Sequence, residues 1–135
     1  MTGRTALRSE AGLVGKSVVV LMFVVLLAGL AVVETASIVF TYVSLDGAAN
    51  EAAKESATTY ASTHNQRAAC AMGKQVMLQR DQDAKFVDRL CRVNSDGSVT
   101  VTVRKEAPTL VVRHVGALDQ LGVVTETVTA GPPSL

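Results

Sequence analysis

The feature that most constrains this chain is an apolar run near the N-terminus that is long enough to cross a membrane. Val18 to Val33 gives 16 consecutive residues without a polar side chain, and after a short interruption that contains Glu34 the apolar character resumes as far as Val43. The hydrocarbon core of a bilayer takes about 20 helical residues. We therefore expect a transmembrane helix over residues 13–43.

The charges that flank the apolar run predict its orientation. Arg4, Arg8 and Lys16 precede the run, whereas acidic and basic residues are mixed after it. Since positively charged flanks stay in the cytoplasm, we expect a single-pass protein of the cell membrane with a cytoplasmic N-terminus and an extracytoplasmic C-terminal domain. The alternative is a cleaved secretory signal with Gly29-Leu30-Ala31 as its cleavage site. The length of the run favours the anchor.

Composition excludes several classes of function. The 135 residues allow one small domain beside the anchor, and the net charge of +1 with no basic patch argues against a nucleic-acid partner. The chain has no Trp, three Phe and two Tyr, which argues against a large aromatic ligand pocket. We expect no small-molecule substrate and no cofactor.

The chain is expected to divide into four segments. These are a disordered cytoplasmic leader in residues 1–12, the transmembrane helix in residues 13–43, an extracytoplasmic α+β domain in residues 44–131 and a tail in residues 132–135. The helix should continue to residue 61, because the sequence after Val43 is Ala-rich and amphipathic. Poor helix formers in Ser62–Asn65 should end it.

The domain itself should contain a second helix and a three-stranded antiparallel sheet. The second helix is predicted over Gln66–Arg80, with inward residues Ala69, Met72, Val76 and Met77. The strands are predicted over Phe86–Val93, Val99–Arg104 with its valines inward, and Val123–Thr129, with a hairpin turn at Asn94–Gly97 and a short helix at Thr109–Leu118. The long N-terminal helix would cover the apolar face of this sheet.

A row of small residues marks one face of the long helix. Ala49, Ala53, Ala57 and Ala61 follow one another at a spacing of four, which lets another helix approach closely. The alternative is that alanine is simply the best helix former.

The two cysteines are candidates for a disulfide. Cys70 and Cys91 have 20 residues between them, and an even count in an outward-facing domain suggests a bond. The alternative is two buried free thiols. Two Cys and two His at no recognised ligand spacing predict no metal site, and His64 and His114 are expected to be surface or packing residues. We expect no catalytic residues and no enzymatic activity.

Glu34 stands out because a carboxylate within an anchor helix is costly. Counted from Lys16, it lies close to the outer interface, where it would reach the lipid headgroups. The alternative is that it pairs with a neighbouring subunit in an assembled helical bundle.

The order of these features resembles the TadE/TadG-like family, the pilin-like minor proteins of tight-adherence pilus systems. The motifs that carry the resemblance are Arg8-Ser9-Glu10-Ala11-Gly12, Val32-Val33-Glu34, the continuation Leu45–Ala53 and the closing segment Val123–Gly131. The resemblance implies a pilin-like fold and leader cleavage after Gly12. It also implies pilin-like or assembly subunits as partners, and a non-enzymatic role in assembling or anchoring a tight-adherence type pilus or related secretion apparatus.

One position departs from the family pattern. Cleavage after Gly12 would make Ser17 the fifth mature residue, where pilin-like proteins usually carry Glu. The chain would then stay an uncleaved membrane component of the apparatus. The alternative function, from another class, is a membrane-tethered extracytoplasmic binding or sensory module unrelated to pili, and a tethered hydrolase is a third.

Overall fold

The computed structural model describes the backbone of residues 7–132 and the side chains of residues 15–132. The first helix, α1, spans Leu7–Thr63, so residues 7–12, expected to be disordered, are helical and include Gly12. Leu, Arg, Glu and Ala in this segment are good helix formers, which explains the earlier start. The expectations for residues 1–6 and 133–135 lie outside the described residues. The chain divides into two compact units after Thr35.

The N-terminal unit contains the first part of α1, whose apolar side chains from Val18 to Leu27 are exposed. Every side chain from Val18 to Leu27 is at least half exposed. A helix of a soluble protein would bury such residues against a core. Within the residues that the structure describes, α1 alone is long and apolar enough to cross a membrane.

The C-terminal unit begins in α1 and contains the second helix, α2 (Gln66–Arg80), as expected from the sequence. The chain turns at His64, whose φ is 51°, and Asn65 caps α2 by accepting a hydrogen bond from the N–H of Ala68 at 3.2 Å. Ala69 and Met77 are buried as expected, but the prediction that Met72 points inward is wrong.

Gly73 explains the position of Met72. A Cβ atom on Gly73 would lie 2.1 Å from the hydroxyl of Ser56 and 3.1 Å from the carbonyl oxygen of Ala52, so α2 approaches α1 closely at this point. The contact line on α2 runs through residues 69, 73 and 77, at a spacing of four, and leaves Met72 exposed.

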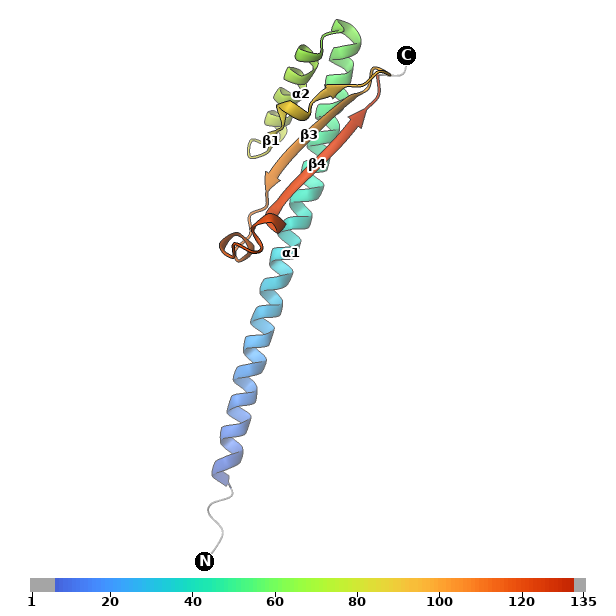
Figure 1. Cartoon of the computed structure of the whole chain (residues 1–135). Helices are drawn as coiled ribbons and strands as arrows, with labels where there is room; N and C mark the ends of the chain where they lie inside the picture. Colours follow the sequence, from blue (N-terminus) through green and yellow to red (C-terminus); the bar gives the residue numbers. More distant parts are fainter. Residues whose placement is uncertain (1–6, 133–135) are drawn as a thin grey trace, which may run out of the picture. The chain divides into compact units, whose positions relative to one another are not determined.

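The sheet has four strands rather than three, and the other three pair antiparallel with the central strand β3 (Val99–Glu106). On one side lies β4 (Val123–Ala130), and on the other lie two short strands, β1 (Lys85–Phe86) and β2 (Arg92–Val93). Figure 1 shows β3 and β4 as the two long antiparallel arrows of the domain. The fold class α+β is therefore confirmed.

The prediction of one continuous strand over Phe86–Val93 is wrong. Phe86 lies opposite Val103 and Arg92 lies opposite Thr100. Six residue steps in the segment from 86 to 92 therefore face only three steps in β3, from 100 to 103. The surplus is taken up by a 3-10 turn, η1, at Asp88–Leu90. The surplus residues thus leave the plane of pairing, as they do in a β-bulge.

Two connections between strands were predicted from different signals, one from turn residues and the other from a helical spacing. The hairpin turn at Asn94–Gly97 is confirmed, with Gly97 at a φ of 81°, which glycine adopts without strain. The helix predicted over Thr109–Leu118 is wrong, because the segment forms only the 3-10 turn η2 (Val112–His114), and a second 3-10 turn, η3 (Asp119–Gly122), follows it. Its β-branched valines and Gly116 are poor helix formers.

The core lies between α1, α2 and the apolar face of the sheet. Val99, Val101 and Val103 are fully buried, as the alternation predicts. The opposite face of β3 is also covered, because threonines pair across the strands. Thr100 bonds to Thr129 at 2.7 Å and Thr102 bonds to Thr127 at 3.0 Å between their hydroxyl oxygens.

Candidate functional site

The first candidate functional surface is the apolar surface of α1 from Val18 to Val33, called here the anchor surface. Apart from Leu30, its large side chains are all exposed. Monomeric soluble proteins rarely expose a continuous apolar patch of this length. The surface is chemically suited to lipid acyl chains or to the apolar surface of another membrane helix.

Glu34 differs from its neighbours on the helix. Its side chain is 7% exposed, whereas Val33 and Thr35 are exposed. A carboxylate that faces lipid costs several kcal/mol, so its burial makes this position of α1 compatible with a bilayer. The expected contacts of Glu34 with headgroups or with a neighbouring subunit stay predictions.

The row of small residues lies mainly inside the domain. Ala49, Ala53 and Ala57 are 0% exposed and belong to the core cluster that includes the valines of β3, whereas Ala61 is exposed. The small side chains thus allow close packing within this chain. The three buried alanines offer no surface to a second chain, because packing in the core already covers them.

The two cysteines form the disulfide that the sequence suggested. Cys70 of α2 and Cys91, which directly precedes β2, have their sulfur atoms 2.01 Å apart and their Cα atoms 6.1 Å apart. The turn η1 brings Cys91 to α2, and the ion pair between Lys74 and Asp88, 2.9 Å between Nζ and Oδ2, joins the same two segments. The bond fixes α2 to the edge of the sheet.

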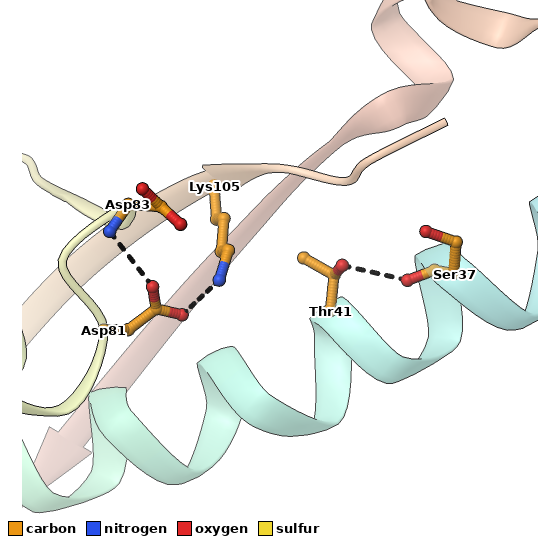
Figure 2. A network of polar contacts seen from close by, with 5 residues as sticks. All are labelled: Ser37, Thr41, Asp81, Asp83 and Lys105. Atoms are coloured by element: carbon orange, nitrogen blue, oxygen red, sulfur yellow. Dashed lines mark hydrogen bonds and ion pairs between the residues drawn. The ribbon is translucent and has the colours of Figure 1, made fainter. Parts of the chain in front are cut away.

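One largely buried ion pair lies at the apolar side of β3. The Nζ of Lys105 contacts the Oδ2 of Asp81 at 2.5 Å, with the two side chains 18% and 9% exposed. The other carboxylate oxygen of Asp81 accepts a hydrogen bond from the N–H of Asp83 at 3.2 Å (Figure 2). A charge buried without its partner is strongly destabilising, so this pair has a structural role.

The groups with shifted pKa values lie on the surface. The guanidinium of Arg80 donates a hydrogen bond to the carboxylate of Glu51, and this bond together with the negative charge of Glu51 raises the pKa of Arg80. Hydrogen bonds from the hydroxyl and the N–H of Ser98 lower the pKa of Asp96 in the hairpin turn. The contacts that cause both shifts are local: one joins α2 to α1 and the other closes the turn.

The histidines have local roles. His64 occupies the turn between the helices, with its ring centroid 5.9 Å from that of Tyr60, and the Nδ1 of His114 lies 2.9 Å from the carbonyl oxygen of Leu110. Among the described residues, no group of three or more His, Cys, Asp or Glu side chains is placed to hold a metal ion.

The class defined by these features is a small disulfide-bonded α+β domain on an apolar helix that is long enough to cross a membrane. Comparison of the chain with protein-family models, with curated proteins and with solved structures finds no match.

One candidate surface was missed at the level of sequence. Leu110, Leu118 and Leu121, between β3 and β4, are exposed. The spacing of Leu110 and Leu118 predicted a short helix over Thr109–Leu118, which the structure does not form. The signal was present as a cluster of apolar residues, but without helix formation the spacing does not predict burial.

Proposed function

We propose that this protein is a non-enzymatic, single-pass, pilin-like membrane protein that acts in assembling or anchoring a tight-adherence type pilus or related secretion apparatus. Its N-terminus lies in the cytoplasm and its C-terminal domain lies outside. Its partners are the membrane and other pilin-like or assembly subunits.

The observation that carries this proposal is the double use of α1. Up to Val33 this helix presents the anchor surface, while from Leu45 to Ala57 it supplies buried residues to the core of the domain. The helix that carries the anchor surface therefore also supplies part of the domain's core. The motifs around Gly12 and Glu34 and the disulfide, which is typical of oxidising compartments outside the cytoplasm, also support it.

An assembly role predicts that the anchor surface contacts other proteins. A photoreactive amino acid placed singly at exposed positions of this surface, such as Val24, Val25 and Val32, should crosslink in native membranes. We expect discrete protein adducts from positions on one side of the helix, because helices pack in membranes along a defined face. The matched control is the same amino acid at Ser95, in the hairpin turn.

Mass spectrometry of the adducts identifies the partners. Recovery of pilus or secretion subunits is the expected result. Lipid adducts alone from every anchor position would contradict the assembly role and favour a tethered binding or sensory module. The intact mass of the chain from the same membranes shows whether it is cut after Gly12.

A further inference from the structure

The loop between β3 and β4, residues 107–122, is attached to α1. Its two ends meet where the N–H of Ala107 donates to the carbonyl oxygen of Gly122 at 2.7 Å. The hydroxyl of Ser37 in α1 donates to the carbonyl oxygen of Pro108 at 2.8 Å. The base of the loop therefore lies beside Ser37, at the end of β3 and β4 opposite the hairpin turn (Figure 1).

This loop exposes large apolar side chains. Leu110 is 65% exposed and Leu121 is 62% exposed, and Leu118 is also exposed. On the stretch of α1 that follows Ser37, Val39, Phe40 and Val43 are exposed as well. The stretch of α1 that follows Ser37 and the loop that is attached at Ser37 thus both expose large apolar side chains.

The depth of this contact follows from the length of the anchor. A count along α1 from Ser17, next to Lys16, reaches Ala36 after about 20 residues, the number that crosses a hydrocarbon core, so the outer part of the expected transmembrane segment 13–43 lies in the headgroup region. Ser37 then falls at the outer boundary of the acyl chains. Tyr42, which is exposed shortly after it, suits the interfacial depth that aromatic side chains prefer.

We propose that the loop 107–122 is a second membrane contact, in which Leu110, Leu118 and Leu121 enter the outer boundary of the bilayer beside α1. This inference rests on the proposed single-pass anchoring. A lipid surface fits because the loop is attached to the helix at the depth where acyl chains meet headgroups, and because the loop exposes large apolar side chains. Arg113, which is exposed on the same loop, is suited to headgroup phosphates.

Depth-dependent quenching tests this contact in the full chain. A single cysteine labelled with the fluorophore NBD is introduced as Leu121→Cys, with the native disulfide kept oxidised. The matched control is Ser95→Cys in the hairpin turn, and Val25→Cys reports on the anchor. Each protein is reconstituted in vesicles of phosphatidylethanolamine and phosphatidylglycerol that carry a doxyl quencher either near the headgroup or deep in the acyl chain.

We expect the shallow quencher to lower the emission at position 121 about twofold and to leave position 95 nearly unchanged, because interfacial residues lie within about 5–10 Å of the headgroup boundary. Aqueous iodide should quench position 95 much more than position 121. Iodide quenching of position 121 equal to that of position 95 would overturn the proposal. Protection of position 121 from both iodide and doxyl lipid would also overturn it, because a protein would then cover the loop.

The probe at position 25 separates this failure from a failure of the anchor. Deep doxyl lipid should quench it if α1 spans the membrane. A quenched position 25 with an unquenched position 121 rejects the loop contact alone, whereas an unquenched position 25 rejects the proposed anchoring.

Discussion

Replacing Cys70 and Cys91 together with alanine should lower the free energy of unfolding of the C-terminal domain by about 3 kcal/mol. The bond joins residues 21 positions apart, and a loop of this size gives that value in the chain-entropy model. The loss is large for a small domain, because the net stability of folded domains is about 5–15 kcal/mol.

Hydrogen exchange of the β3 amides in the reconstituted full chain measures this effect, because these amides lie in the central strand. The matched control is Ala71→Ser, which changes an exposed residue next to Cys70 and leaves the bond intact. Equal protection of β3 in the double-alanine variant and in the native chain would show that the disulfide does not support the fold.

The second large effect is expected within the alanine row. Ala53→Leu should destabilise the domain by about 1–3 kcal/mol, because the larger side chain must fit where Ala53 is 0% exposed in the core. The matched control is Ala61→Leu, the same substitution in the same row. It should change the free energy of unfolding by less than about 0.5 kcal/mol, because residue 61 is exposed.

Exchange protection of β3 compares the two leucine variants directly. A loss of protection in the Ala53 variant alone is the expected result. Equal protection in both variants would mean that the core adapts to the added volume. This result would contradict the inference that α1 packs closely inside the domain.

The helices could be predicted well because their signals are local. Poor helix formers in Ser62–Asn65 end α1 and Asn65 caps α2, so the break after Thr63 and the start of α2 follow from nearby residues. The inward position of Gly73 could not be predicted, because it depends on where Ser56 and Ala52 lie across the interface.

The sheet was predicted less well because its details depend on pairing. The alternation of Val99–Arg104 correctly predicted the buried valines, and Gly97 correctly predicted the turn. The split of the first strand into β1 and β2 depends on the register against β3 and on the reach of Cys91 to Cys70. Neither is a local property of the sequence.

The most direct test of the account is the topology of the full chain in a bacterial membrane. Two reporters are fused separately to the C-terminus. Alkaline phosphatase is active only outside the cytoplasm. Green fluorescent protein fluoresces only in the cytoplasm, because it does not become fluorescent when the general pathway exports it. The charges before the anchor predict an active phosphatase and a dark fluorescent protein. A fluorescent fusion with an inactive phosphatase would contradict the proposed single-pass orientation.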